Sequence, residues 1–503
     1  MKAALDGYKR IPNQDIQEIL KISYNALEDS VKEVFLHIAC FFKGKNQNNV
    51  IPILEGCDLN PKYSIEVLTD KAMINIKGNN IWMHDLLEEM GKEIISQELP
   101  TELGERSRLW FHEDVYCVLT EKTGTNKIKG IMVNLVEPDD EICLSAKSFS
   151  EMKNLQLLFI RNARFSGDHV AYLSNELRLL DWPECPLQAL PSTFNPRKLV
   201  ELNMPRSRLL QLGEGLKSCM FLTKTPNFSG IPNLEILNLE GCTSLVEVDH
   251  SVGFLQKLSR LNLKGCRNLT LFPRSISLKC LESIYLSDCG KLEHFPEIAG
   301  KMGSLTWMDV SRTAIKELPS SIGYLTGLQT LLLLGCENLT TLPFKPDPLL
   351  LPTNANSLLS NCGSLLLSKL EEFDMKGGNL SEINFLGTLD GVSTLFRLDL
   401  SGSNFVIFPV SITRYISLRI LYLHGCKRLE EIPELPPKVG WLDASGCVSL
   451  EGFSKLSNIM EPKELQMISW MDLSNCRRLF DNLARDGEKM KNKSVNDQAS
   501  PLL

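Results

Sequence analysis

The sequence predicts an α/β chain in which a small helical domain is followed by a long solenoid of short parallel strands. Apolar residues recur at helical spacing through about the first hundred residues, whereas farther on the pattern Leu-x-x-Leu-x-Leu-x-x-Cys recurs about every 23 residues. The chain has 503 residues, of which 43% are hydrophobic and 23% are charged, enough for more than one folded domain.

The repeat predicts the solenoid directly. Its cleanest copies begin at Leu234, Leu258, Leu281, Leu305 and Leu328, which lie 23 or 24 residues apart. Each Leu-x-Leu run can form a strand whose leucines point inward, because side chains alternate along a strand and stacked coils bury one face. This period is typical of a leucine-rich repeat horseshoe. Earlier copies begin at Leu155, Leu177 and Leu199, and later, more loosely spaced ones at Leu370, Leu395, Leu418, Val439 and Ile468, so we assign residues 126–480 to the solenoid.

The register of the repeat fails in two places. Leu199 and Leu234 are 35 residues apart, so we interpret residues 216–226 as a shortened repeat. Leu328 and Leu370 are 42 residues apart with prolines between them, which predicts a break in the solenoid near residues 344–369. Residues 481–503 are polar, and we expect them to form a disordered tail.

Many of the 15 cysteines share one position of the repeat. A disulfide needs two closely paired cysteines, whereas these occur one per coil and suit small buried plugs. We therefore expect reduced thiols and a location in the cytoplasm or nucleus. No Cys-x-x-Cys with partner histidines appears, so no metal site is expected. The repeated cysteines are Cys242, Cys266, Cys289, Cys336, Cys426, Cys447 and Cys476.

Residues 1–125 have a different pattern. Ile16, Ile19 and Leu20 lead the apolar face of a first predicted helix, and further helices are expected around 31–42, 50–54 and 65–68. Two short strands at 73–76 and 81–83 then flank a Gly-Asn turn. Helices followed by such a hairpin predict a winged-helix domain. Val31, Val34, Phe35, Ile38, Ala39 and Phe42 are expected to line its core.

The charge of this region argues against nucleic acid as a partner. Residues 1–120 carry 13 Lys and Arg against 19 Asp and Glu, so their net charge is 13 − 19 = −6. A DNA-binding winged helix needs a basic footprint. No apolar run approaches the length of a membrane span either, so we expect neither nucleic acid nor membrane binding.

Several stretches of sequence resemble plant intracellular nucleotide-binding leucine-rich-repeat immune receptors. They read Ile-Leu-Lys-Ile-Ser-Tyr-Asn-Ala-Leu at 19–27, Val-Phe-Leu-His-Ile-Ala-Cys-Phe-Phe-Lys-Gly at 34–44 and Trp-Met-His-Asp-Leu-Leu-Glu-Glu-Met-Gly at 82–91. The wording is most similar to the branch with a Toll/interleukin-receptor-like (TIR) N-terminal domain, and Gly-Glu-Arg-Ser-Arg-Leu-Trp at 104–110 resembles its linker. By this resemblance, residues 1–125 are the C-terminal part of an NB-ARC module with its linker.

The resemblance implies a nucleotide-switch motif at Met83, His84 and Asp85. In the family the histidine contacts the ADP phosphate and the aspartate supports it. An imidazole at a helix start can donate to a phosphate oxygen, where backbone N–H groups also favour anions. The plainer alternative is a surface or core histidine at a junction between a strand and a helix.

The rest of the nucleotide machinery is absent from the sequence. The phosphate loop Gly-x-x-x-x-Gly-Lys-Ser/Thr does not occur, so we expect no cofactor to be bound by this chain alone, although the intact family uses ADP and ATP. No Ser-His-Asp wording or metal cluster suggests an enzyme. The sequence therefore resembles a receptor shortened at both ends.

The outward strand positions beside the central leucine are the predicted protein-binding surface, because stacked strands form one continuous face. Exposed aromatic residues there are good anchors, since such residues dominate interface energies. The alternatives are that the tryptophans pack against loops or a further domain, and that the aspartates of Leu-Asp-Leu-Ser are repeat consensus. The candidates are Ile236, Arg260, Tyr285, Trp307, Arg397, Tyr422, Trp441 and Trp470.

The resemblance and this surface together imply a non-catalytic function in plant innate immunity. We expect the repeats to sense a pathogen effector or a guarded host protein and to take part in defence signalling, with other immune receptors as further partners. The alternative is a leucine-rich-repeat scaffold or decoy without switch activity.

Overall fold

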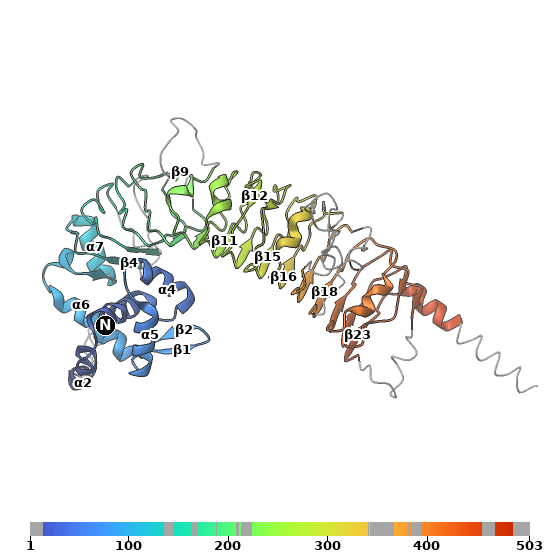
Figure 1. Cartoon of the computed structure of the whole chain (residues 1–503), viewed down its shortest axis with the longest axis horizontal. Coiled ribbons are helices and arrows are strands. Elements are labelled where there is room, and N and C mark those ends of the chain that lie inside the picture. The colour runs from blue at the N-terminus through green and yellow to red at the C-terminus, as the bar shows by residue number, and fades with distance from the viewer. Residues whose placement is uncertain are drawn as a thin grey trace, which may run out of the picture. The chain divides into compact units, whose positions relative to one another are not determined.

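The computed structural model describes residues 14–134, 144–161, 170–187, 189–207, 211–212, 224–340, 342, 367–380, 383, 386, 394–454 and 468–485. The chain separates into two compact units, Met1–Ser244 and Leu245–Leu503. Unit 1 holds the helical region and the first strands of the solenoid, and unit 2 holds later coils of parallel strands (Figure 1).

The helical region of unit 1 ends in the predicted wing. Strands β1 and β2 pair antiparallel around Gly78 and Asn79, both of which have positive φ. Two such residues are typical of the tight turns that match the twist of a hairpin. The elements are α2 (Gln14–Asn25), α3 (Asp29–His37), the π-helical turn η1 (Ile38–Phe42), α4 (Gln47–Gly56), α5 (Pro61–Asp70), β1 (Asn75–Lys77), β2 (Asn80–Trp82) and α6 (Asp85–Glu98).

The core of the helical region lies where the apolar spacing predicts, with one local difference. The predicted core residues from Val31 to Phe42 are all buried. However, α3 widens into η1, in which Lys43 N–H donates to Ile38 O at 2.9 Å. The wider turn buries five consecutive residues, which a regular amphipathic helix does not do.

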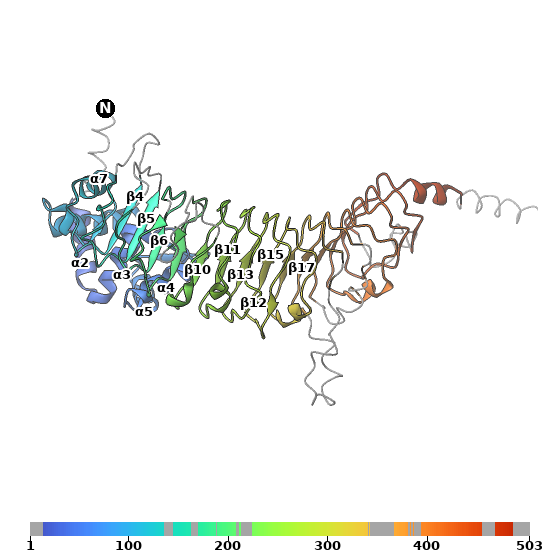
Figure 2. The ribbon, with the colours of Figure 1, turned by 90° about the horizontal axis from the view of Figure 1, so that it is seen from above.

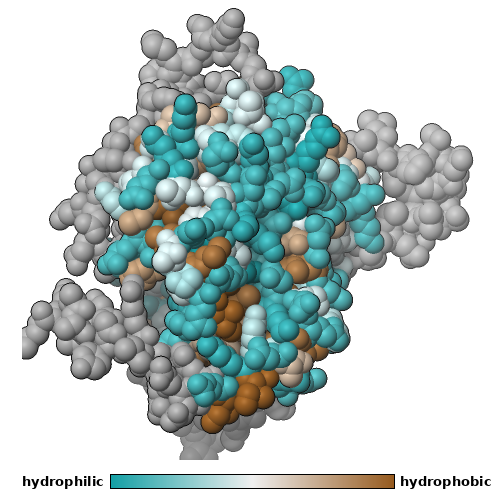
Figure 3. Space-filling model, turned by 90° about the vertical axis from the view of Figure 1, so that its left-hand side faces the viewer, coloured by the Kyte–Doolittle hydropathy of each residue, from teal (hydrophilic) through white to brown (hydrophobic). Residues whose placement is uncertain are grey.

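Helix α2 differs from the expectation. Ile19 is 65% exposed and Ile22 is 69% exposed, so the apolar face led by Ile19 is not fully buried; the side chain of Ile16 lies outside the described residues. Figure 3 views the helical end of the chain and shows a mostly hydrophilic surface interrupted by smaller hydrophobic groups. On the face seen there, the exposed apolar residues form separate groups.

The solenoid of unit 1 is a parallel sheet in register. Central residues Leu158, Leu180, Leu202 and Leu237 pair along it and are at most 3% exposed. Strand β3 already pairs with β4, so the sheet begins inside the region assigned to the helical domain and linker, upstream of residue 126. The elements are η2 (Leu103–Glu105), β3 (Arg108–Leu109), α7 (His112–Glu121), β4 (Gly130–Asn134), β5 (Leu157–Arg161), β6 (Leu179–Asp181), β7 (Ala189–Leu190), β8 (Glu201–Asn203), β9 (Gln211–Leu212), η3 (Phe228–Gly230) and β10 (Ile236–Asn238).

Unit 2 continues the same repeat with its own parallel strands, which lie side by side in Figure 2. Pairs run from β11 through β13, β15, β16, β17, β18, β19 and β21 to β23. The elements are η4 (His250–Phe254), β11 (Arg260–Asn262), β12 (Ser275–Ile276), β13 (Ser283–Tyr285), β14 (Glu297–Ile298), β15 (Trp307–Asp309), η5 (Ser320–Tyr324), β16 (Thr330–Leu332), β17 (Glu372–Asp374), β18 (Arg397–Asp399), η8 (Val410–Arg414), β19 (Ile420–Tyr422), β20 (Glu431–Ile432), β21 (Trp441–Asp443), β22 (Gly452–Phe453) and β23 (Trp470–Asp472).

The two predicted irregularities fall mainly outside the described residues. Of the shortened repeat at 216–226, only residues 224–226 are described, and of the break at 344–369, only 367–369. Strand β16 nevertheless pairs directly with β17, with Thr330 opposite Glu372. The sheet itself therefore continues across the long spacing. The tail predicted from residue 481 is helical through 485, and 486–503 lie outside the described residues.

The repeated cysteines are buried inside their coils. The Sγ atom of Cys289 donates to Leu263 O at 3.2 Å, and Cys336 donates to Val310 O at 3.2 Å. Cys426, Cys447 and Cys476 donate in the same way to Leu400, Leu423 and Ala444. The cysteines of the described part of the chain are free thiols. Within that part, no helix has the length and apolar character needed to cross a membrane.

Candidate functional site

The Met83-His84-Asp85 motif joins the wing to α6. Met83 is buried in the helical core, whereas His84 is exposed and is the N-cap residue of α6. Its Nδ1 accepts the backbone N–H of Leu86 at 3.2 Å. A neutral imidazole that accepts at Nδ1 carries its proton on Nε2. We therefore assign His84 an Nε2–H group that is available as a hydrogen-bond donor. It lies at the start of a helix, where an anion is favoured.

Asp85 is tied to the end of the π-helical turn. Lys43 forms an ion pair with Asp85 and donates to Glu88 at 2.5 Å, and Glu88 also accepts from Lys92 at 2.6 Å. The hydrogen bond from Lys43 lowers the pKa of Asp85 below its usual value. Lys43 is the residue whose backbone N–H closes η1. Asp85 therefore couples the motif to the turn that follows α3.

A cavity of about 530 Å³ opens beside His84. Lys77 lies on its wall, with Nζ 6.0 Å from the ring centroid of the half-exposed Trp82. None of its lining residues is acidic, and the lining contains both a lysine and the imidazole. This chemistry suits an anion. The lining residues are Thr69, Ala72, Met73, Ile74, Asn75, Lys77, Trp82, Met83 and His84.

The π-helical turn also holds the helical region on the solenoid. The ring of Phe41 stacks on Phe159 of β5 with centroids 5.5 Å apart, and Phe42 meets the same ring edge-on at 5.9 Å. Phe159 occupies an outward position, because its neighbour Leu158 points into the solenoid. Leu157, Phe159, Leu179 and Val200 all belong to the buried cluster of the helical region. The first outward strand positions are thus covered by the chain's own helices.

Three cations of the solenoid also contact the helical region. The guanidinium of Arg178, only 1% exposed, donates to Gly56 O at the end of α4. A helix C-terminus leaves carbonyl oxygens without intrahelical donors, so a buried cation there satisfies one. Arg108 and Lys129 pair with Glu33 of α3 at 2.9 and 3.2 Å. Sequence reasoning missed these arginines, because an arginine in a single sequence is normally read as exposed.

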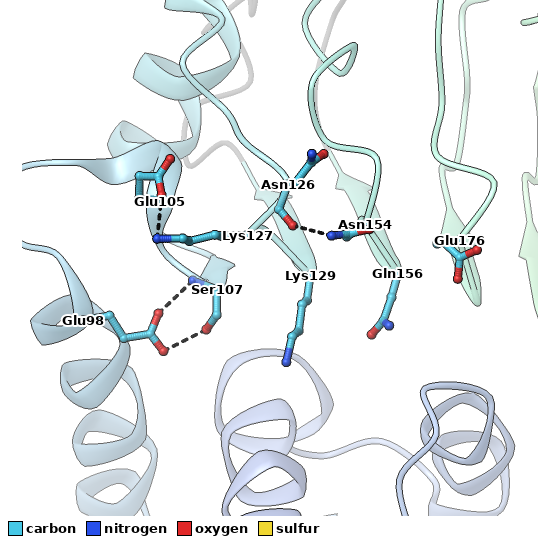
Figure 4. Close-up of a pocket in the computed structure, with 9 residues that line it drawn as sticks. All are labelled: Glu98, Glu105, Ser107, Asn126, Lys127, Lys129, Asn154, Gln156 and Glu176. Atoms are coloured by element: carbon cyan, nitrogen blue, oxygen red, sulfur yellow. Dashed lines mark hydrogen bonds and ion pairs between the residues drawn. The ribbon is translucent and has the colours of Figure 1, made fainter.

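A second cavity, of about 490 Å³, lies in unit 1 beside the strands. Figure 4 shows its polar residues, most of which precede successive strands, with Glu98 of α6 beside Ser107. Glu98 accepts from Ser107 N–H and Oγ–H at 2.8 and 2.9 Å, and Lys127 pairs with Glu105 at 2.9 Å. Glu176 pairs with Lys198 at 3.1 Å. These charges are paired with one another or with nearby side chains. The cavity is therefore a polar contact region within unit 1 rather than a strong ligand site.

The predicted surface residues of unit 2 line up along the sheet. Strand pairing places one column through Arg260, Ser283, Trp307, Thr330, Glu372, Arg397, Ile420, Trp441 and Trp470. The column two residues farther along contains Tyr285, Asp309, Asp374, Asp399, Tyr422, Asp443 and Asp472. Both columns face outward, since the central residues between them are inward.

Exposure along these columns is uneven. Arg260 is exposed and Trp441 is 40% exposed, whereas Ile236 in unit 1 is only 8% exposed and offers a partner little surface. The rings of Trp441 and Trp470 stack 4.3 Å apart, and Arg397 lies over Tyr422 at 5.2 Å. Tyr285 and Trp307 lie 6.5 Å apart. The structure therefore gathers the predicted aromatic residues in neighbouring pairs.

The aspartates of the second column have a structural role. Asp309, Asp374, Asp399 and Asp443 each accept the backbone N–H two residues later at 3.0 Å, and Asp472 does so at 2.8 Å. A carboxylate in this position forms a turn that resembles an Asx-turn. This geometry explains why the repeat favours Asp or Asn there, and it uses only one oxygen of each carboxylate. The described residues contain no group of three or more His, Cys, Asp or Glu placed to hold a metal ion.

Two family models match parts of the chain. Residues 28–98 match the family model "Disease resistance protein Roq1-like, winged-helix domain", and residues 276–375 match "Disease resistance protein RPS4B-like, leucine-rich repeats". Among solved structures, the Leptospira interrogans LRR protein LIC12759 is 19% identical over 65% of this chain and 78% of its own, with a TM-score of 0.39. The Yersinia pestis leucine-rich effector YopM is 18% identical over 76% and 97%, with a TM-score of 0.40.

Curated relatives extend the match to nearly the whole chain. TMV resistance protein N of Nicotiana glutinosa is 32% identical over 94% of this chain and 47% of its own length. Disease resistance-like protein DSC1 and disease resistance protein LAZ5, both of Arabidopsis thaliana, are each 31% identical, over 95% and 93% of this chain and 46% and 42% of their own lengths. The chain thus spans about half the length of the curated relatives it matches. With its winged helix and its leucine-rich repeats, it belongs to the plant disease resistance proteins of the nucleotide-binding leucine-rich-repeat family.

Proposed function

We propose that this chain is the sensing and switching part of a plant immune receptor and acts without catalysis of its own. Its repeats bind a pathogen effector or a guarded host protein, and its winged helix responds to that contact. The reduced, buried thiols support a location in the cytoplasm or nucleus. The names of the relatives support the role in disease resistance.

The observation that carries the proposal is a continuous set of contacts from the strand face to the switch motif. Phe159 on β5 packs on Phe41 and Phe42, Lys43 follows directly, and Lys43 pairs with Asp85. A shift of the strands would therefore move the turn that holds the motif. Packed side chains with two arrangements are a physical route for such coupling.

The role in resistance is tested in the source plant. Plants that lack the gene should support more pathogen growth, and a transgene for the wild-type chain should restore resistance. A Trp441→Ala/Trp470→Ala variant should fail to restore it, while Cys280→Ala, which alters an exposed thiol away from the strand face, should succeed. Full resistance from the tryptophan variant would contradict sensing through this face.

For His84 we propose that Nε2–H faces a nucleotide phosphate in the off state. The acid-free cavity with Lys77 supports this placement. His84→Ala removes both the cap and the donor and should cost about 1 kcal/mol of stability, whereas His84→Asn keeps a capping oxygen. Loss of calorimetric ADP binding in both variants, with wild-type melting retained in His84→Asn, would identify a phosphate contact.

The alternative is a scaffold or decoy without switch activity. One observation favours it: the Nδ1 atom of His84 is already used as a helix cap. If the wild-type chain gives no heat with ADP or ATP, while His84→Ala still lowers the melting temperature, the motif in this chain serves only the helix cap.

A further inference from the structure

The last coils of unit 2 carry an aromatic surface with carboxylates beside it. We name Trp441, Asp443, Trp470 and Asp472, on strands β21 and β23, the C-terminal strand face. We propose that this face binds a basic segment of a partner protein, with an arginine or lysine of the partner over the tryptophan pair and beside the two aspartates. The inference rests on the proposed function and specifies the chemistry of the partner.

The tryptophan pair is built like a binding anchor. Trp441 and Trp470 occupy the same column on adjacent strands and stack at an interplanar angle of 21°. Trp441 keeps 40% of its surface exposed, although its strand pairs with a neighbour on both sides. A large aromatic ring on a stiff strand loses little entropy when a partner covers it, which is why such residues dominate interfaces.

The charge beside the pair is negative. Asp443 follows Trp441 by two residues and Asp472 follows Trp470 by two, so each aspartate shares the outward face with its tryptophan. Oδ1 of each accepts a serine N–H, at 3.0 Å for Asp443 and 2.8 Å for Asp472. Within residues 394–454 and 468–485, neither aspartate has an ion-pair partner. Both carboxylates therefore keep a negative charge that a basic partner can neutralise.

In the coils just before this face, an arginine of the chain itself makes the contacts that we expect from an arginine of the partner. Arg397 lies over the ring of Tyr422 at 5.2 Å. The same guanidinium lies 3.3 Å from Glu372 and 4.0 Å from both Asp374 and Asp399. Cation–π stacking and carboxylate pairing thus act on one arginine of the chain itself.

The C-terminal strand face repeats the aromatic rings and carboxylates of that arrangement but supplies no arginine of its own. A partner's arginine would complete it. An acidic segment would meet Asp443 and Asp472 with like charge, which disfavours binding. The face therefore selects a cationic partner rather than an apolar or acidic one.

The test uses the full chain and two labelled peptides of equal length, Gly-Arg-Gly-Arg-Gly-Arg and Gly-Glu-Gly-Glu-Gly-Glu. Binding is measured by fluorescence anisotropy at low and high salt. We expect only the arginine peptide to bind, more weakly at high salt because the contact is partly exposed. Trp441→Ala should weaken its binding about tenfold by loss of the ring.

A second variant removes charge without altering the fold. In Asp443→Asn/Asp472→Asn, the amide oxygen can still accept the serine N–H, so the turns are retained, and arginine-peptide binding should weaken about fivefold. The matched control is Asp288→Asn, which removes a carboxylate that pairs with Arg312 elsewhere in unit 2. It should bind the peptide like the wild type. Equal binding of the two peptides, or unchanged binding by the double variant, would overturn the proposal.

Two further outcomes are distinguishable. If sedimentation shows that the wild type dimerises and Trp441→Ala does not, the occupant is a second copy of this chain, and the proposal of a basic partner fails. If the arginine peptide binds as expected but the tryptophan variant still restores resistance in plants, the chemistry of the face holds and the proposed sensing function fails.

Discussion

The outward strand positions of the two units have the same register but opposite surroundings. In unit 1, Leu157, Phe159 and Leu179 are at most 3% exposed, because the helical region covers them. In unit 2, Arg260 is exposed and Trp441 is 40% exposed at equivalent outward positions. The inward leucines are alike in both. The difference teaches that the repeat fixes the strands, while the outward side chains decide what each coil binds.

The charges around these positions differ in the same way. The solenoid of unit 1 presents Arg108, Lys129 and Arg178 to carboxylate and carbonyl oxygens of its own helices. Unit 2 presents Asp443 and Asp472 beside open aromatic rings. Unit 1 is thus a completed interface within one chain, and it shows the combination of aromatic packing and charge pairing that an open face can use.

The largest expected effect comes from the ring at the centre of the covered interface. Phe159→Ala removes a buried ring that contacts Phe41 and Phe42 and should lower the free energy of unfolding of unit 1 by about 3–5 kcal/mol. Urea unfolding measures the loss, and limited proteolysis should show cleavage between the helices and the solenoid. Phe254→Ala, at a half-exposed ring of unit 2, is the control and should change stability by less than about 0.5 kcal/mol. Equal losses in the two variants would contradict the comparison.

The next effect concerns a buried cation. Arg178→Met keeps much of the side-chain volume but leaves Gly56 O without its donor, so we expect a loss of about 2 kcal/mol in urea unfolding. The matched control is Arg206→Met. Arg206 is 69% exposed and pairs with the equally exposed Glu184 at 3.4 Å, so its loss should cost about 0.5 kcal/mol or less. If Arg206→Met lowers the free energy of unfolding as much as Arg178→Met does, burial does not distinguish the two arginines.

The sequence predicts most of the repeat but little of the covered interface. The alternation of Leu-x-Leu and the 23-residue period determine both register and face, so the columns of Trp307, Trp441 and Trp470 could be predicted. The wing was predicted for a similar reason, since Gly78-Asn79 marks its turn. These are local patterns, and local patterns are visible in one sequence.

The contacts that join the helices to the strands are not local. The apolar run Ile38–Phe42 suits an ordinary helix, and its π-helical form accompanies packing against Phe159, more than a hundred residues away. Burial of Arg178 depends on Gly56, 122 positions earlier. The exposure of Ile19 and the burial of Ile236 likewise depend on tertiary surroundings that spacing does not specify.

The inward thiols should respond to alkali in the same way in both units. Burial raises the pKa of Cys242 in unit 1 to about 11 and that of Cys289 in unit 2 to about 12. The unfolded thiol loses its proton near pH 9, before the folded one, so the stabilising contribution is complete below pH 9 and falls as pH rises toward the folded pKa. Between these two pKa values, each thiol lowers the free energy of unfolding by roughly 1.4 kcal/mol per pH unit.

Urea midpoints between pH 8 and 11 measure this loss. The urea midpoints of Cys289→Ala and Cys242→Ala should each fall less steeply with pH than that of the wild type. The matched control is Cys280→Ala, which alters an exposed thiol. A shallower slope in only one of the two buried variants would show that the inward positions of the units also differ.

The smallest effect separates the turn role of the aspartates from partner binding. Asp309 accepts Ser311 N–H at 3.0 Å, so Asp309→Ala should cost about 0.5–1 kcal/mol, while Asp309→Asn retains an acceptor and should be nearly neutral. Urea unfolding measures both variants. If Asp309→Asn is as unstable as Asp309→Ala, the aspartate stabilises the fold through its negative charge rather than through the turn. In that case the carboxylates of the C-terminal strand face would be structural charges too, and their value for a basic partner would have to be measured against the stability that they supply.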